Sequence, residues 1–156
     1  MVARLVLPLP HQEATRELGR RLARLIRSGD VIALRGVLGS GKTELARALL
    51  RARAGAEIEV PSPSYTLVQD YRFSDLVIRH IDLYRIEDPT ELLELGLDAP
   101  AAGEAWLLEW PERATGVLPA DRLDLELRQG KVADARSAHL SAGRGWAQRL
   151  DELRST

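Results

Sequence analysis

The sequence contains no cysteine, which excludes disulfides, thiolate metal sites and cysteine nucleophiles. It also contains no asparagine, and of its 22 basic residues only Lys42 and Lys131 are lysine. No apolar run is long enough for a membrane span, and the first residues, through Pro8, are too short and interrupted for a secretory leader. We therefore expect a cytoplasmic protein.

The ionisable residues point to neither a nucleic-acid surface nor a metal cluster. The formal net charge of −1 gives no broad basic field, so any contact with RNA would need a partner. His11, His80 and His139 are too far apart in sequence to form a local metal motif. We expect them to be structural or to face solvent.

The length of 156 residues fits one domain, and we expect residues 1–156 to form it. Its short apolar strands alternate with amphipathic helices, which indicates an α/β protein. The predicted strands are 4–7, 31–34, 65–71, 76–84, 105–108, 123–128 and 135–141. Helices are predicted after Pro10, after residue 41, from a cap at Asp88 with Pro89 in the first helical position, and at the C-terminal end. We expect a mixed, partly parallel central sheet flanked by helices.

The segment from Gly36 to Thr43 has the pattern of a phosphate-binding loop: glycine, four free positions, glycine, lysine and threonine. It lies between an apolar strand and a helical pattern, the context that this chemistry requires. Its glycines let backbone N–H groups and the helix N-terminus face phosphates together. Lysine is rare here, yet it stands at position 42, where an arginine fork would be too bulky. The sequence therefore predicts a three-layer fold like that of P-loop NTPases.

Each position of this loop has an expected role. Lys42 would reach the β- and γ-phosphates, and the Thr43 hydroxyl would bind Mg²⁺. A chain without asparagine cannot hold the asparagine-lysine-x-aspartate segment that commonly reads guanine, so we expect ATP rather than GTP. Candidates for contact with the base are residues 11–15, above all Thr15, together with Lys131. The loop residues expected to bind nucleotide are Gly36, Leu38, Gly39, Ser40, Gly41, Lys42 and Thr43.

A triphosphate site also needs a carboxylate at the end of a neighbouring strand to hold Mg²⁺ or its water shell. Glu109 ends a wholly apolar strand and is the cleaner candidate, whereas the strand that ends at Asp82 is interrupted by polar residues. We expect Lys42, Asp82 and Glu109 to form the catalytic group. The alternative for either acid is a solvated strand end.

Two further features lie near these acids. The segment 60–66 combines two prolines with Ser62, Ser64 and Thr66, whose hydroxyls could meet a γ-phosphate or an attacking water. It has the character of a switch segment, although a rigid proline turn would give the same pattern. Trp110 could stack on a base or a partner, or simply pack.

Beyond the phosphate loop, the chain contains the blocks Ser62-Pro63-Ser64-Tyr65-Thr66, His80-Ile81-Asp82-Leu83-Tyr84-Arg85 with Glu87-Asp88-Pro89, Leu108-Glu109-Trp110-Pro111-Glu112-Arg113 and Leu118-Pro119-Ala120-Asp121-Arg122-Leu123. In order and spacing, the loop and these blocks resemble the TsaE (YjeE) family over about residues 10–145. The phosphate loop alone is generic, whereas the aspartate-leucine-tyrosine-arginine and glutamate-tryptophan-proline-glutamate blocks together are specific.

The resemblance implies a bacterial ATPase that serves the threonylcarbamoyladenosine (t6A) modification of tRNA. It implies docking on the TsaB–TsaD pair, with an ATP cycle that resets the complex while tRNA is held mainly by those partners. Carried over to this chain, Lys42 would hold phosphate, Thr43 and Glu109 would bind Mg²⁺, and Asp82 would order the metal or the water. Residues 62–66 would act as the switch.

The chain departs from the family pattern at three positions. Val37 stands where aspartate is common, and both Ser64 and Glu44 stand where threonine is common. Serine keeps the hydroxyl, whereas Val37 removes a carboxylate beside the phosphates and Glu44 adds negative charge in the first helical turn.

Two other functions remain open: a small-molecule kinase, and a nucleotide-gated binding module with negligible turnover.

Overall fold

The computed structural model describes residues 3–37, 39–61 and 67–154. Within them, the elements follow the order β1 (Ala3–Leu9), α1 (Gln12–Leu25), β2 (Val31–Arg35), α2 (Lys42–Ala54), β3 (Val68–Arg72), β4 (Val77–Asp82), α3 (Thr90–Glu94), β5 (Glu104–Glu109), η2 (Pro111–Ala114), β6 (Leu123–Gln129), β7 (Arg136–Ala142) and α4 (Arg149–Arg154). The predicted alternation of strands and helices is confirmed.

The described strands form one seven-stranded sheet in the order β1-β7-β6-β2-β5-β4-β3. Strands β6, β2, β5 and β4 run parallel, whereas β7 and β1 at one edge and β3 at the other are antiparallel additions. The mixed, partly parallel sheet expected from the sequence is therefore confirmed. The first four residues of β2 are apolar and buried because parallel strands on both sides and layers on both faces enclose them.

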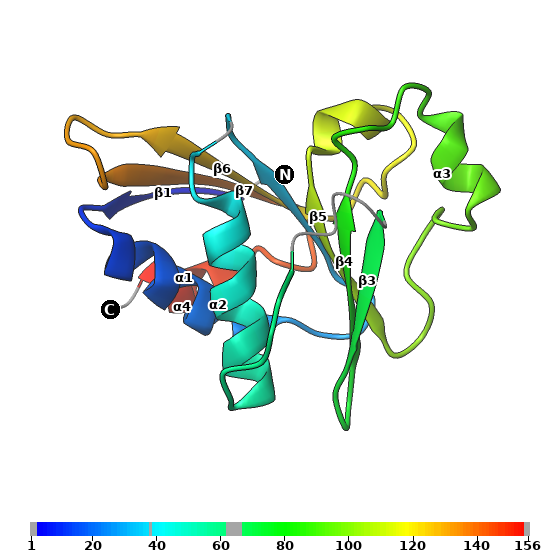
Figure 1. The fold of residues 1–156 in the computed structure, drawn as a ribbon, viewed down its shortest axis with the longest axis horizontal. Coiled ribbons are helices and arrows are strands. Elements are labelled where there is room, and N and C mark those ends of the chain that lie inside the picture. Colours follow the sequence, from blue (N-terminus) through cyan, green and yellow to red (C-terminus); the bar gives the residue numbers. More distant parts are fainter. Residues whose placement is uncertain (1–2, 38, 62–66, 155–156) are drawn as a thin grey trace.

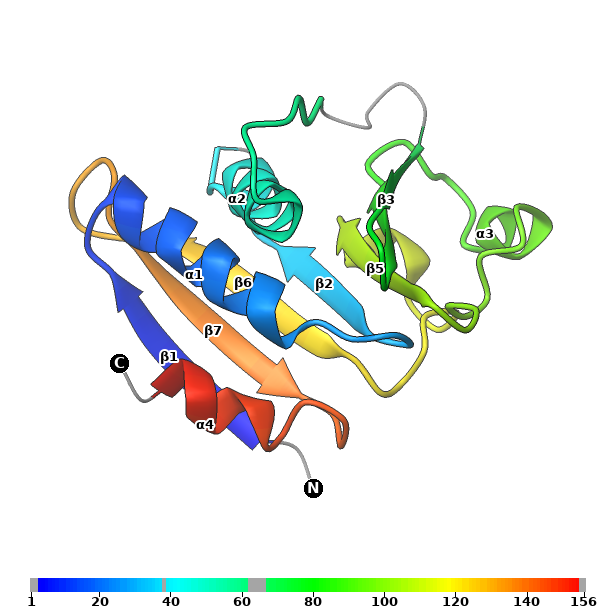
Figure 2. The same cartoon turned by 90° about the horizontal axis from the view of Figure 1, so that it is seen from below.

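Helices cover the two faces of the sheet unequally. Figures 1 and 2 show α1, α2 and α4 together on one side, with α3 apart from them beyond β4. The larger core joins those three helices to the sheet, and in α2 it buries Leu45, Leu49 and Leu50 completely. Burial of each such side chain contributes about 1.5–3 kcal/mol, which fixes α2 and the loop that precedes it on β2. A smaller core around Trp106 and Leu108 packs under α3 and η2.

The start of α3 differs by one residue from the prediction. The helix begins at Thr90, and Pro89 stands at the N-cap rather than in the first helical position. Asp88 still acts as expected of a cap, because its Oδ1 accepts a hydrogen bond from the Thr90 N–H at 3.0 Å. The difference is small because Pro89 already has helical dihedral angles, φ −54° and ψ −26°.

No helix among the described residues combines the length and apolar character needed to cross a membrane.

Candidate functional site

The carboxyl ends of three parallel strands meet at one edge of the sheet. Strand β2 leads directly into the predicted phosphate loop, and β4 and β5 end at the two predicted acids. The register pairs Glu109 with Leu34 of β2 on one side and with Asp82 of β4 on the other. Both carboxylates therefore stand level with the start of the loop, where ligands of open α/β sheets bind.

The loop itself is a tight turn that only glycine allows at its first position. Gly36 has φ 144°, and a Cβ there would lie 2.5 Å from Ser40 Oγ and 2.8 Å from the Leu127 carbonyl oxygen. Gly41 caps α2 in the left-handed conformation, with φ 105°. These two residues set the chain between β2 and α2, and they leave the first N–H groups of α2 without carbonyl partners in their own helix.

Lys42 is buried beneath this loop, and three acids surround it. Its side chain is 5% exposed, its Nζ donates to the Gly36 carbonyl, and that nitrogen lies 3.3 Å from the centroid of the Trp110 ring. Burial lowers the pKa of the Lys42 ammonium, while the charges of Glu109, Glu112 and Asp82 oppose that shift. The ammonium thus lies within electrostatic reach of these three acids.

Glu109 connects the loop to the sheet through both of its oxygens. The Thr43 hydroxyl donates to Oε1 at 3.2 Å, and His80 Nε2 lies 2.7 Å from Oε2. Glu109 is 3% exposed and Asp82 is 7% exposed, and Asp82 Oδ1 accepts the Tyr84 N–H at 2.9 Å. The structure thus brings together Lys42, Thr43, Glu109 and Asp82, and neither acid is a solvated strand end.

This set of side chains fits a phosphate chain with a hard divalent cation. Mg²⁺ commonly takes only one or two protein oxygens when phosphates supply others, and the Thr43 hydroxyl and Glu109 carboxylate are such a pair. Within the described residues no three His, Cys, Asp or Glu side chains form a metal cluster of their own. The buried Ser40 Oγ, which has no hydrogen-bond partner in the described part of the chain, is a further donor at the loop.

Trp110 adopts a backbone conformation that is rare for a bulky residue. Its φ is 61°, immediately after Glu109, and its ring packs against Tyr84 at a centroid distance of 5.0 Å. The ring is therefore occupied by Lys42 on the loop and by Tyr84. In this structure Trp110 is a packing residue of the site, one of the two roles considered from the sequence.

A small cavity beside the loop contains one of the residues that were predicted to contact the base. It measures about 130 Å³, and Thr15 lines it together with Gly39, Ser40 and Gly41. Thr15 thus lies beside the loop, and its contact with the base stays a prediction. Lys131 is exposed in the connection between β6 and β7 and is not among the residues of this cavity. Leu38, Ser62, Ser64 and Thr66 lie outside the described residues, so their expected roles stay predictions.

Arg136 is a residue of the site that no local motif announces. From β7 it crosses to the loop, where its Nε donates to the Ser40 carbonyl at 2.9 Å and its Nη2 to the Gly39 carbonyl at 3.0 Å. Its Nη1 donates to the carbonyls of Ala133 and Ala135 in the β6–β7 connection. The guanidinium therefore fastens the phosphate loop to a hairpin almost one hundred residues further along the chain.

The family comparison agrees with this geometry. A family model described as "Threonylcarbamoyl adenosine biosynthesis protein TsaE" matches residues 9–138, which include the loop and both acids. The chain belongs to the TsaE family. The match also contains Thr15 and Arg136, so the whole of the site described above lies inside the TsaE-family region.

Individual relatives show the same likeness over most of their length. The TsaE protein of Haemophilus influenzae is 34% identical over 140 residues, which cover 86% of this chain and 87% of that protein. The Bacillus subtilis TsaE protein is 30% identical over 142 residues, covering 90% and 88%. A crystal structure of YdiB from Bacillus subtilis superposes with a TM-score of 0.76 at 27% identity, and the match covers 98% of this chain and 95% of that one.

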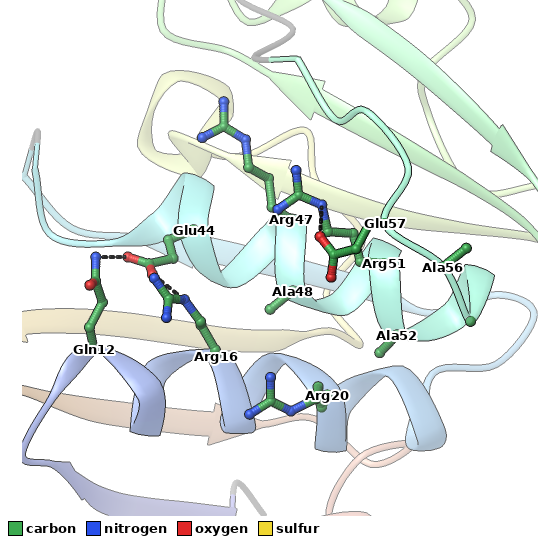
Figure 3. A pocket seen from close by; sticks show the side chains of 11 residues that line it. Gln12, Arg16, Arg20, Glu44, Arg47, Ala48, Arg51, Ala52, Ala56 and Glu57 are labelled. Carbon is green, nitrogen blue, oxygen red and sulfur yellow. Dashed lines mark hydrogen bonds and ion pairs between the residues drawn. The ribbon is translucent and has the colours of Figure 1, made fainter.

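The structure explains one departure from the TsaE-family pattern. Glu44 has two partners on α1, because Gln12 Nε2 donates to it at 3.0 Å and Arg16 Nε pairs with it at 2.8 Å (Figure 3). It also lines the small cavity beside the loop. The positive charge of Arg16 thereby compensates the added negative charge. Val37, the other departure of consequence, is 63% exposed at the loop.

A groove of about 890 Å³ lies between α1 and α2 (Figure 3). Its arginines already have partners within the chain. Arg20 pairs with Glu17 at 2.8 Å, and Arg47 and Arg51 donate to the carbonyls of Val60 and Ile58. We therefore regard this groove as a polar seam between two helices and place the candidate site at the loop.

Proposed function

We propose that this protein is a cytoplasmic ATP-binding and ATP-hydrolysing subunit of the bacterial machinery that makes t6A in tRNA. In this proposal residues 1–156 act as one P-loop ATPase domain that docks on the TsaB–TsaD pair and resets it between turnovers. The observation that carries the proposal is the meeting of Lys42, Thr43 and Glu109 at the end of β2 and β5, within 3.2 Å for the last two.

The chemistry of each residue follows from its position. Lys42 is held near three acids and would exchange its contacts with Gly36 and Trp110 for phosphate oxygens. Thr43 and Glu109 would hold Mg²⁺, which when bound neutralises the charge that develops on the phosphates. Asp82, level with Glu109, would order the water shell of the metal or the attacking water. Thr15 and Lys131 would contact the base.

Two observations support work with a partner over autonomous turnover. Val37 and Tyr84 expose apolar surface next to the loop, with 63% and 42% of their areas open. The net charge of −1 leaves RNA binding to other subunits. The names of the relatives, which are tRNA threonylcarbamoyladenosine biosynthesis proteins, give the pathway in which such partners would act.

ATP hydrolysis measured alone and then with purified TsaB and TsaD tests the proposal. We expect slow hydrolysis alone and clear stimulation by the pair together. Phosphoryl transfer to a metabolite would instead indicate a small-molecule kinase. Nucleotide-dependent docking without phosphate release would indicate a gated binding module.

Substitution at Glu109 ties the activity to this site. Glu109→Gln keeps the shape but removes the charge, and it sets an amide or carbonyl against His80, so stimulated hydrolysis should fall at least about a hundredfold. Glu104→Gln is the matched control, because Glu104 stands at the opposite end of the same strand, where it accepts the Ala101 N–H. Equal loss in both variants would show that the effect is structural.

A further inference from the structure

His80 is a fully buried polar residue. Among the described residues, its side chain forms a hydrogen bond with one acid, Glu109. It lies in β4, is 0% exposed, and its Nε2 stands 2.7 Å from Glu109 Oε2. Its other ring nitrogen, Nδ1, is buried and has no hydrogen-bond partner among the described residues. An apolar side chain would fill this place without the cost of desolvating an imidazole, so the histidine needs a reason.

The strand register explains how His80 reaches the acid. In the β4–β5 pairing His80 stands opposite Leu107 and Asp82 opposite Glu109. Successive side chains of a strand alternate between faces, so His80 and Asp82 share the face of β4 that Leu107 and Glu109 share on β5. The imidazole therefore reaches the carboxylate from two positions before the end of β4, whereas the phosphate loop lies beyond the end of β2.

Two donors then fix the plane of the carboxylate. A carboxylate only accepts hydrogen bonds, so the hydrogen of the imidazole must be on Nε2, and it is donated to Oε2. Thr43 donates to the other oxygen, Oε1, at 3.2 Å. Without the imidazole, Glu109 would be free to rotate toward Lys42, whose ammonium it already influences. A direct ion pair between them would withdraw both groups from a ligand.

We propose that His80 is a positioning residue, which holds the Glu109 carboxylate away from Lys42 with one oxygen directed to Thr43. This inference rests on the proposed function, in which Thr43 and Glu109 hold Mg²⁺ beside a nucleotide. It predicts that His80 controls the affinity for the metal rather than for the nucleotide, since its Nε2 contacts Glu109 and not the phosphate loop.

The experiment compares His80→Phe, which keeps a ring but no donor, with His80→Gln, which keeps an N–H close to the position of Nε2. Calorimetry would first measure ADP binding in the presence of EDTA and then titrate Mg²⁺ into the ADP complex. Outer-shell partners typically contribute 10- to 100-fold to metal affinity. We expect His80→Phe to weaken Mg²⁺ binding by about that factor, to change metal-free ADP affinity less than about threefold, and His80→Gln to recover most of the loss.

His139→Phe is the matched control. His139 is half-buried on β7, contacts Ser137 Oγ at 3.0 Å, and lies outside the site, so Mg²⁺ affinity should not change. An equal loss of metal-free ADP binding and of Mg²⁺ binding in His80→Phe would overturn the inference. Indistinguishable Mg²⁺ affinities for His80→Phe and His80→Gln would overturn it as well.

Ring ¹⁵N NMR of the unmodified protein gives a readout that does not depend on whether a variant folds. The inference predicts a proton on Nε2 of His80 that is protected from exchange, and a ring protonated only on Nδ1 would contradict it. Glu109→Gln distinguishes a failure of the proposed metal site from a failure of the role of His80. Unchanged Mg²⁺ affinity in that variant refutes the proposed metal site itself, whereas loss in Glu109→Gln with none in His80→Phe refutes only the role of His80.

Discussion

Replacing Arg136 with alanine should weaken nucleotide binding about tenfold or more without unfolding the protein. Arg136 supplies two hydrogen bonds to the phosphate loop, at 2.9 Å to Ser40 and 3.0 Å to Gly39. Bonds from charged donors contribute about 1.5–3 kcal/mol each, and partial exposure reduces this to about 1 kcal/mol. Losing both therefore favours a disordered loop by about 2 kcal/mol. Because only the ordered loop can cradle phosphates, affinity should fall about ten- to thirtyfold.

Calorimetric titration of ADP, with thermal unfolding alongside it, measures this effect. Arg136→Lys should behave almost like Arg136→Ala, because one ammonium cannot reach both carbonyls as the guanidinium fork does. Arg128→Ala in the preceding strand is the control, since Arg128 pairs with Glu126, at 2.6 Å. Affinity of Arg136→Ala within twofold of the unmodified protein, or an equal loss in Arg128→Ala, would refute the reasoning.

Three further predictions follow from single side chains. Lys42→Met should abolish ADP binding in calorimetry yet raise the free energy of unfolding at pH 7, because burial lowers the pKa of the lysine and so destabilises its charged form. Below the folded-state pKa, the buried ammonium of Lys42 lowers the free energy of unfolding by its full amount. This destabilisation disappears as the pH rises through 10.5, the ordinary pKa of lysine. The stability gain of Lys42→Met should therefore vanish in alkaline denaturation curves. Glu44→Ala should lower stability by about 0.5–1 kcal/mol but alter ADP affinity less than twofold, since Glu44 contacts Gln12 and Arg16; a large change of affinity would show that it faces the nucleotide. Val37→Asp should leave the melting temperature unchanged because the side chain is 63% exposed, and it should change hydrolysis only when TsaB and TsaD are present.

The parts of the site that follow strand ends were predictable from the sequence. The carboxyl ends of parallel strands meet at one edge, so an apolar strand before Gly36 and another before Glu109 were enough to expect the two together. The same reasoning placed Asp82, although polar residues interrupt its strand. The predicted hairpins also hold, because turn residues and alternating apolar positions are local signals.

The contacts that the sequence does not reveal depend on strand order and on register. His80 and Glu109 are 29 positions apart, and Arg136 and Gly39 are 97 apart. Neither pair belongs to a spacing motif. His80 meets Glu109 only because β5 lies between β2 and β4, and Arg136 meets the loop only because β7 follows β6 in the sheet. Polar residues in otherwise apolar strands, such as His80, are the one local sign of such contacts.

Calorimetric titration of ADP and GDP, each with Mg²⁺, into the unmodified protein and into Lys42→Ala tests the central claim most directly. The account predicts that ADP binds, that GDP binds at least about tenfold more weakly, and that Lys42→Ala binds neither. Equal affinity of Lys42→Ala and the unmodified protein for ADP would contradict it, because the loop from Gly36 to Thr43 would then not be the nucleotide site.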